Sequence, residues 1–283
     1  MNYELVNNIT PGSDVWEKVK QNVAKDDATV ITLTAAPRFF GLLQDEGVKG
    51  INVLDHVTKR SYVPDQYRFF NDVPVPTWAK IDMNQDGSIL VSDQGDVIAR
   101  EYLFGNTRRA VQDVRYNNPD GTLDYIEEYA FDGTVFSNLF YADNQLQEIV
   151  FYNSDVQPVV RYYFYEGVIN FVTIEDPKTH AVLKDYENLD AFLVDQVAQL
   201  VTEDDTVVFH YMGVEMNSLR EAKSHNVLEM AESVLDENGN VRGNLDLILQ
   251  GQLDYIDEVR VDSQGYHDLE QSGVPMDRVV EVK

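Results

Sequence analysis

The spacing of hydrophobic residues follows two rhythms along this chain, and the first is an alternation of helices and strands. Ser13 precedes a stretch whose apolar residues recur at helical spacing from Val15 to Val23, which predicts a capped amphipathic helix. The run "ATVITLT" (28–34) is apolar and β-branched, as is typical of a buried parallel strand. After a turn or helix over "FFGLLQDEG", the run "INVL" (51–54) predicts another short strand.

The second rhythm begins after "VPVP", whose prolines forbid a regular helix and mark a boundary. From Trp78 to about Ile174, runs rich in Tyr, Phe and Val are separated by turn residues at short intervals. The acidic turn residues recur every 11 or 12 positions: Asp120, Asp132, Asp143, Asp155 and Glu166. Each of them follows a run that contains aromatic residues. This spacing predicts an antiparallel β-meander with one strand per repeat.

The alternation of helices and strands returns near residue 186. Helices are predicted over 189–201 and 218–235, and strands over 206–212, 245–250, 257–262 and 277–282. A last helix, ended by Gly273 and Pro275, separates the final two strands. We therefore predict an α/β fold, in which a Rossmann-like parallel-sheet domain (1–73 and 181–283) is interrupted by a Tyr-rich antiparallel β-meander insertion (74–180).

The stretch "DMNQDGSILVSD" (82–93) has the spacing of a calcium loop, with Asp82, Asn84 and Asp86 at alternate positions before Gly87. An EF-hand needs a helix on each side, but prolines precede this stretch and an alternating, strand-like run follows it. The ninth position is a leucine and the twelfth is Asp93 rather than glutamate. The stretch is therefore interpreted as a turn between two strands, and no metal site is expected.

Composition narrows the class of protein. The chain has 22 Lys and Arg against 49 Asp and Glu, a formal net charge of −27, so nucleic acid and anionic lipid are not expected partners. The absence of cysteine excludes disulfides and suits the cytoplasm. The amino-terminal segment lacks the charge and apolar pattern of a signal peptide, and no apolar run is long enough to span a membrane.

Motifs that carry catalytic chemistry are missing from the sequence. It contains no GxGxxG or GxxxxGK[ST] phosphate loop, no Asp-x-Asp, no HExxH and no GxSxG. No catalytic residue and no cofactor is therefore expected. His210 and Tyr211 lie near the carboxyl end of the predicted strand 206–212, outside which ligands of open α/β sheets bind, and His225 with Asn226 lies in a predicted helix. These four are candidate binding residues, with packing or surface roles as the open alternative.

The order of these patterns resembles a known family. An Asn-acid-Val-Pro-Val-Pro stretch (71–76), then Trp78, leads into the aromatic meander, which is followed by helix, "VVFHYMG", helix and strand. This is similar to the non-catalytic, glycosyltransferase-stabilising component of the protein O-GlcNAc transferase in Gram-positive accessory secretion loci. That family has two Rossmann domains, whereas this chain ends after what is expected to be the first, as a truncated form or a short family member.

The resemblance implies a non-catalytic chaperone in the cytoplasm, or peripheral at the inner face of the membrane. Its implied partners are the catalytic glycosyltransferase subunit and a Ser/Thr-rich adhesin polypeptide. His210, Tyr211, His225 and Asn226 are then expected to bind the acceptor, and three meander tyrosines to contact the partner: Tyr129, Tyr141 and Tyr152. Two alternatives remain open, a carbohydrate-binding or protein-interaction β module without a transferase partner, and an enzyme with its site near His210.

Overall fold

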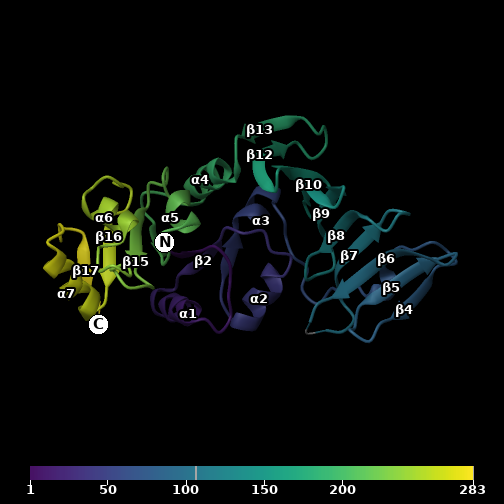
Figure 1. Ribbon diagram of the computed structural model, residues 1–283, viewed down its shortest axis with the longest axis horizontal. Coiled ribbons are helices and arrows are strands. Elements are labelled where there is room, and N and C mark those ends of the chain that lie inside the picture. Colours follow the sequence, from purple (N-terminus) through teal and green to yellow (C-terminus); the bar gives the residue numbers. More distant parts are fainter. Residues whose placement is uncertain (106, 283) are drawn as a thin grey trace. The chain divides into compact units, whose positions relative to one another are not determined.

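The computed structural model describes residues 1–105 and 107–282, and these form two compact units (Figure 1). Unit 1 comprises Met1–Thr34, Glu46–Val53 and Asp190–Lys283, and unit 2 comprises Ala35–Asp45 and Leu54–Leu189. Unit 2 thus holds the residues between Leu54 and the "VPVP" stretch as well as the meander.

Unit 1 is built on a seven-stranded parallel sheet. Its strands, in spatial order, are β17 (Val279–Glu281), β16 (Glu258–Val261), β15 (His225–Glu229), β14 (Thr206–Phe209), β1 (Asn2–Val6), β2 (Thr29–Thr32) and β3 (Gly50–Asn52). The chain first passes from β1 to β2 and β3, then returns to β14 on the other side of β1 and continues outward. The direction of winding therefore reverses between β1 and β14, as in a Rossmann-like doubly wound sheet.

The helices of unit 1 accompany these strands. They are α1 (Asp14–Asp26), α4 (Leu189–Leu200), α5 (Val214–Ser218), α6 (Gly243–Leu249) and α7 (Ser263–Ser272). The predicted cap of α1 is confirmed, because the Ser13 side chain accepts a hydrogen bond from the Trp16 backbone amide at 3.2 Å. Trp16 and Val19 are buried, so the apolar face of α1 packs into the unit as its periodicity predicts.

Two predicted elements of unit 1 are wrong, the strand predicted over 51–54 is right only up to Asn52, and one further strand was not predicted. Residues 218–235 do not form a helix, because β15 runs through the middle of this range and is buried between β14 and β16. Residues 245–250 do not form a strand but belong to α6. A short apolar run such as "NVLE" fits either structure, and its place in the sheet decides between them. The unpredicted strand is β1, whose run "NYELV" contains the charged Glu4.

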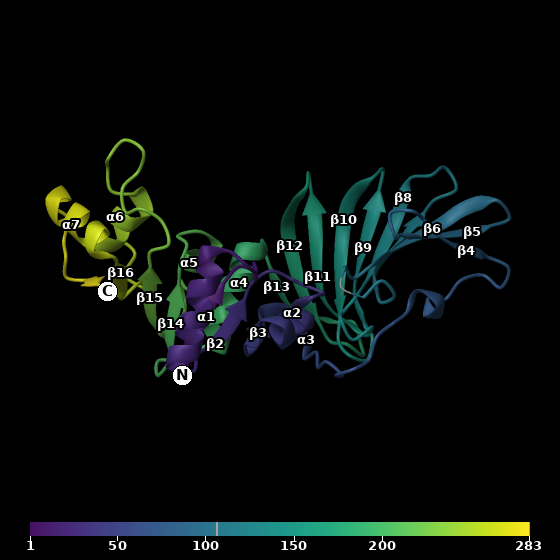
Figure 2. The same ribbon diagram turned by 90° about the horizontal axis from the view of Figure 1, so that it is seen from below.

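Unit 2 contains a ten-stranded antiparallel sheet in which every strand pairs with its neighbours in the sequence, so the predicted meander is confirmed (Figure 2). The strands are β4 (Lys80–Met83), β5 (Ile89–Asp93), β6 (Asp96–Leu103), β7 (Val111–Asn117), β8 (Leu123–Tyr129), β9 (Val135–Ala142), β10 (Gln145–Tyr152), β11 (Pro158–Tyr165), β12 (Val168–Glu175) and β13 (Val182–Tyr186). Asp143 and Asn144 both have positive φ, as a tight two-residue hairpin requires.

The calcium-like stretch is the β4–β5 hairpin, which confirms its interpretation as a turn. The Asn84 amide donates to the Ser88 carbonyl at 2.8 Å, and Gly87 has a φ of 84°. The Asp86 carboxylate accepts from both the amide and the hydroxyl of Ser88, so it stabilises the turn itself. Among the described residues, no group of three or more His, Cys, Asp or Glu side chains could hold a metal ion.

The connection that leads into the meander is pinned to the ends of the strands. It includes α3 (Val53–Thr58) and the 3-10 turn η1 (Phe70–Asp72), while α2 (Phe39–Glu46) precedes β3. The buried Arg60 guanidinium donates to Thr134 Oγ1 at 2.8 Å and to the carbonyls of Val135 and Tyr152 at 2.7 and 2.6 Å. Gly133 lies so close to this connection that a Cβ there would be 2.2 Å from the Arg68 amide nitrogen. No helix in the described part of the chain is both long and apolar enough to cross a membrane.

Candidate functional site

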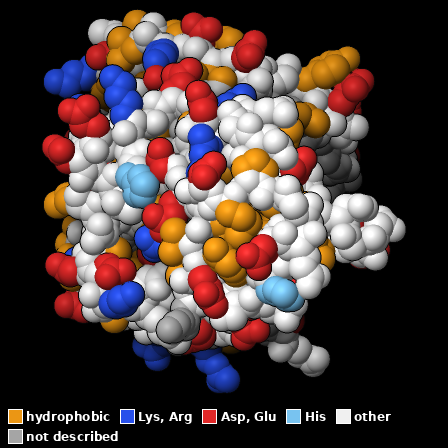
Figure 3. Space-filling model, turned by 90° about the vertical axis from the view of Figure 1, so that its left-hand side faces the viewer, with side chains coloured by type: hydrophobic (Ala, Val, Ile, Leu, Met, Phe, Trp, Pro, Cys, Tyr) orange, Lys and Arg blue, Asp and Glu red, His pale blue; other side chains and the backbone are white. Residues whose placement is uncertain are grey.

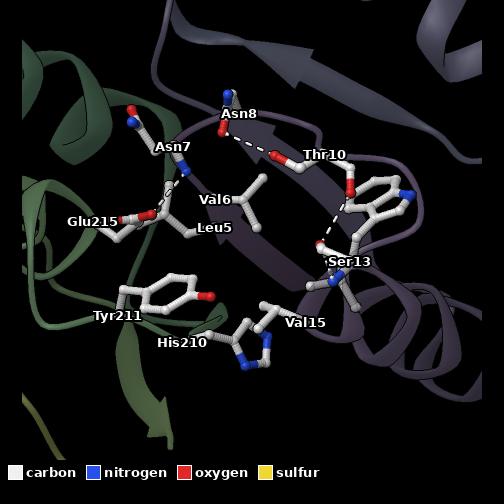
Figure 4. A pocket seen from close by; sticks show the side chains of 12 residues that line it. Leu5, Val6, Asn7, Asn8, Thr10, Ser13, Val15, His210, Tyr211 and Glu215 are labelled. Atoms are coloured by element: carbon white, nitrogen blue, oxygen red, sulfur yellow. Dashed lines mark hydrogen bonds between the residues drawn. The ribbon is translucent and has the colours of Figure 1, made fainter. Parts of the chain in front are cut away.

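A crevice of about 140 Å³ opens in unit 1 where β1 and β14 end (Figure 4). Ligands of doubly wound sheets bind at this reversal point, because the loops that follow the two strands diverge there and leave room between them. Two loops line it, the first running from Asn7 to Ser13 and the second containing His210 and Tyr211. Glu215 of α5 completes the rim.

The first loop is held in place by its own polar groups. The Asn7 backbone amide donates to Glu215 Oε1 at 3.0 Å, and the Asn7 side chain accepts from Thr34 Oγ1 at 2.7 Å. Ser13 donates its hydroxyl to the Thr10 carbonyl at 3.0 Å while it caps α1. These bonds leave Asn8 and Thr10 exposed at the mouth of the crevice.

The second loop begins with a histidine that is buried rather than presented to solvent. The His210 side chain is 1% exposed, and its Nε2 lies 2.9 Å from Oε2 of Glu4, whose side chain is 2% exposed. The other ring nitrogen, Nδ1, lies 3.2 Å from the Glu229 carbonyl oxygen. Burial raises the pKa of Glu4, and the hydrogen bond with His210 opposes that rise only in part. Next to it, Tyr211 is 42% exposed and directs its hydroxyl toward the centre of the crevice (Figure 4).

Apolar side chains and neutral polar groups share the lining, and its apolar part consists of Leu5, Val6, Val15, Trp16 and Val19. The lining also offers amides, hydroxyls and the Tyr211 phenol, with Glu215 as a carboxylate, and contains no lysine or arginine among its described residues. A nucleotide diphosphate needs cations or converging backbone amides. The crevice therefore suits an uncharged ligand better than a phosphate.

The structure separates the four residues that were predicted to bind the acceptor. His210 and Tyr211 line the crevice at the carboxyl end of β14. His225 pairs with Thr206 at the amino ends of β15 and β14, so it lies at the opposite end of the sheet, 48% exposed. Asn226 is buried there, where its side chain donates to the Tyr255 carbonyl at 2.8 Å and accepts from Ser224. The wrong helix prediction for 218–235 had hidden this separation.

The three meander tyrosines do not form one surface either. Tyr129 is 1% exposed, and its hydroxyl donates to Glu127 while the Arg68 guanidinium lies over its ring. Tyr141 and Tyr152 are half-buried. Only these two have surface to offer a partner.

Several residues of the crevice were not singled out from the sequence. Asn7, Asn8, Thr10 and Glu215 line it, and Glu4 lies beneath it. One signal in the sequence could have identified Asn7, Asn8 and Thr10. A short strand followed by a polar loop with Pro-Gly and a capped helix ("NNITPGSD") is typical of the carboxyl end of a strand in a doubly wound sheet. Finding it required recognising β1 as a strand.

Comparison with known proteins bears on the fold. Neither a protein-family profile nor a curated protein matches the chain in sequence. Its structure resembles accessory secretory protein 1, 2 and 3 from Streptococcus pneumoniae, with a TM-score of 0.78 and 14% identity over 100% of this chain and 62% of the other. It also resembles the pneumococcal O-GlcNAc transferase GtfA in complex with UDP and GlcNAc, with a TM-score of 0.78 and 17% identity over 100% of this chain and 59% of the other. For the GtfA/B complex bound to UDP and GlcNAc, the TM-score is 0.71 and the identity 18%, over 100% of this chain and 61% of the other.

The likeness establishes the fold. The resemblance to the glycosylation proteins of accessory secretion is confirmed at the level of the structure, and so is the Rossmann-like sheet interrupted by a β-meander. This chain spans only 59% to 62% of the length of those three structures.

Proposed function

We propose that this chain is the non-catalytic, acceptor-holding subunit of a protein O-glycosylation complex, and that it acts in the cytoplasm or at the inner face of the membrane. Its ligand is a Ser/Thr-rich adhesin polypeptide and its partner the catalytic glycosyltransferase. The observation that carries the proposal is the crevice, whose described lining places neutral hydrogen-bonding groups beside apolar side chains and offers no cation to a diphosphate. The fold shared with a GtfA/B complex and with accessory secretory protein supports the setting.

The state of His210 also supports a non-catalytic role. A general acid or base must reach the proton that it transfers, within about 3 Å. The His210 ring is 1% exposed and both of its nitrogens are used, by Glu4 and by the Glu229 carbonyl. It therefore serves the shape of the crevice rather than proton transfer to a ligand.

The acidic surface favours a basic or neutral partner. Carboxylates spread over the face that Figure 3 shows instead of gathering in one patch. A net charge of −27 repels nucleotide sugars and anionic lipids alike at low ionic strength. We assign the contact with the catalytic subunit to the meander sheet, at Tyr141 or at Tyr152, which lie on opposite faces of it.

A second candidate function is a carbohydrate-binding β module. It is favoured by the aromatic row on the meander, where Tyr116 and Tyr125 stack with centroids 4.4 Å apart and Tyr125 and Phe140 with centroids 6.0 Å apart. Rings that stack on each other cover each other's faces, however, and sugars bind to exposed ring faces. This arrangement makes the carbohydrate module the weaker candidate.

The test measures binding of a fluorescent Ser/Thr-rich peptide by anisotropy. Tyr211→Ala removes the phenol that points into the crevice, so we expect the dissociation constant to rise about tenfold, the effect of losing one good hydrogen bond and its packing. His225→Ala is the matched control, because His225 lies at the opposite end of the same sheet. Its dissociation constant should match that of the unsubstituted protein. Weaker binding in His225→Ala with normal binding in Tyr211→Ala would place the acceptor at the other end and refute the crevice assignment.

The partner contact has its own test. Either Tyr141→Ala or Tyr152→Ala, depending on which face the partner covers, should weaken co-purification with the catalytic subunit, whereas Asp124→Asn, an exposed change on β8, should not. Tyr129 is unsuitable because it is buried in the fold. Normal co-purification of both tyrosine variants would place the contact elsewhere.

A further inference from the structure

The buried pair beneath the crevice has a defined hydrogen-bonding state. The Nδ1 atom of His210 lies 3.2 Å from the Glu229 carbonyl oxygen. A carbonyl oxygen only accepts hydrogen bonds, so Nδ1 must carry a proton. The 2.9 Å contact between Nε2 and Glu4 Oε2 then contains one further proton, either as a carboxylic acid that donates to a neutral imidazole or as an imidazolium that donates to a carboxylate.

We infer that Glu4 is a positioning residue for the crevice: its carboxyl group and the His210 imidazole share one proton, and this shared proton fixes the turn that carries Tyr211. The pair is neutral in total whichever atom holds the proton. With the proton gone, a carboxylate would face an imidazole lone pair at 2.9 Å. With a second proton added, the pair would be a buried cation. Both states are costly where the side chains are 1% and 2% exposed.

The charged groups around the pair are already engaged. From β15, the Glu229 carboxylate is held by Lys18 Nζ at 2.9 Å and by Asn22 Nδ2 at 2.9 Å, both from α1. Burial by itself would raise the pKa of Glu229, but the bonds from Lys18 and Asn22 outweigh it, and the pKa is lowered. From α5, Glu215 is taken by the Asn7 amide. None of these groups supplies the proton that the pair shares, so it belongs to Glu4 and His210 alone.

The pair lies beneath the two loops that line the crevice. Glu4 belongs to β1, His210 follows β14, and Glu229 ends β15 while it bonds to α1, whose first turn closes the crevice. Figure 4 shows the His210 and Tyr211 side chains on the same wall. A change in the protonation of the pair therefore moves the residue that carries the Tyr211 hydroxyl. The assignment of a peptide ligand rests on the proposed function, but the proton and its effect on the turn do not.

Histidine ¹⁵N chemical shifts test the inference without any ligand. In the ¹⁵N-labelled protein we expect the His210 ring to carry hydrogen at Nδ1 and to sense Glu4 at Nε2. In Glu4→Gln the amide can donate to Nε2, so the tautomer should persist with Nε2 as an acceptor. In Glu4→Leu nothing faces Nε2, so its ¹⁵N shift should become that of a ring nitrogen without a hydrogen bond, while Nδ1 keeps its hydrogen for the Glu229 carbonyl. An Nδ1 without hydrogen in the unsubstituted protein would overturn the inference.

A second readout follows the crevice itself. Trp16 is a lining residue, and in a Trp78→Phe background it is the one remaining tryptophan of the sequence. We expect its fluorescence to change in that background when the pair loses its shared proton at alkaline pH, and this alkaline change to be absent in Glu4→Gln, which has no carboxyl proton to lose. His225→Gln is the control and should behave like its parent. The same pH response in Glu4→Gln as in its parent would refute the shared proton.

Peptide binding separates this inference from the proposed function. If both hold, the Ser/Thr-rich peptide should bind Glu4→Gln within about twofold of normal and Glu4→Leu about tenfold more weakly. If no variant binds the peptide but the ¹⁵N and fluorescence results hold, the proposed function fails and the positioning role stands. If the peptide binds and Glu4→Gln shows the same alkaline fluorescence change as its parent, the positioning role fails alone.

Discussion

At the scale of single residues, the buried carboxyl of Glu101 on β6 stands out. Its side chain is fully buried, and neither of its oxygens has a hydrogen-bond partner among the described residues. It pairs across the sheet with Ile89 and Val114. Val114 and Ala99, which lies two residues away on β6, belong to one buried apolar cluster. Burial raises the pKa of Glu101 to about 7. An uncompensated carboxyl of this kind costs stability whenever it ionises.

We predict that Glu101→Gln makes the protein less sensitive to pH. The folded form holds the Glu101 proton up to about pH 7, whereas the unfolded chain loses it near its ordinary value, so the contribution to stability is present at low pH and is lost as the pH rises toward 7. The glutamine variant lacks this loss. Its free energy of unfolding relative to the unsubstituted protein should rise by about 2–3 kcal/mol between pH 4.5 and 8.

Urea unfolding at several pH values measures that difference. Asp124→Asn on β8 is the control, because its side chain is exposed and its effect should not depend on pH in the same way. A constant difference between Glu101→Gln and the unsubstituted protein across this range would contradict the buried ionisation.

Two glycines in similar Asp-Gly-Thr turns give a second prediction at this scale. Gly121 and Gly133 have φ values of 87° and 80°, so alanine is strained by about 1–2 kcal/mol at either position. A Cβ on Gly121 meets nothing within 4 Å, whereas one on Gly133 would overlap the backbone of Arg68. We therefore expect Gly133→Ala to lower the free energy of unfolding of unit 2 by clearly more than Gly121→Ala. Equal losses in thermal unfolding would show that the connection does not press on the turn.

At the scale of elements, the β4–β5 hairpin yields a negative prediction. The Asp86 carboxylate is taken up by Ser88, and its pKa is lowered first by the hydrogen bond from the Ser88 side chain. Asp82 lies on β4, paired with Leu90, so its side chain is not part of the turn. Isothermal titration should show no calcium binding tighter than about millimolar. Micromolar binding that Asp82→Ala abolishes would mean that the hairpin rearranges around the ion.

The elements show what the sequence could predict and what it could not. The meander was predictable because turn residues such as Asp132 and Asp143 recur at one spacing. Each turn is also a local feature of the backbone, with a positive φ at Gly133 and at Asp143. The capped start of α1 was predictable for the same local reason. β15 and α6 were mistaken because their short apolar runs suit either structure, so only their neighbours in the sheet decide. Predicting the crevice required recognising β1 as a strand, and the charged Glu4 obscured its apolar pattern. The residue that Glu4 contacts, His210, is 206 positions away in the sequence.

At the scale of the whole molecule, the crevice and the missing phosphate loops lead to the same expectation. A glycosyltransferase must stabilise the leaving diphosphate with cations or aimed backbone amides. The crevice lining has no lysine or arginine among its described residues, and the sequence has no Gly-rich phosphate loop. The histidine in the crevice lining, His210, is buried and paired with Glu4. The chain should therefore transfer no sugar by itself.

The assay incubates UDP-GlcNAc and a Ser/Thr-rich peptide with the chain alone, with the catalytic subunit alone, and with both. We expect no glycosylated peptide by mass spectrometry in the first case and more in the third than in the second, because the crevice would hold the peptide near the enzyme. Tyr211→Ala should remove that gain while His225→Ala keeps it, since Tyr211 lines the crevice and His225 lies at the opposite end of the sheet. Sugar transfer by the chain alone would refute the non-catalytic role. Equal products in the second and third cases would leave the chain without a part in acceptor binding.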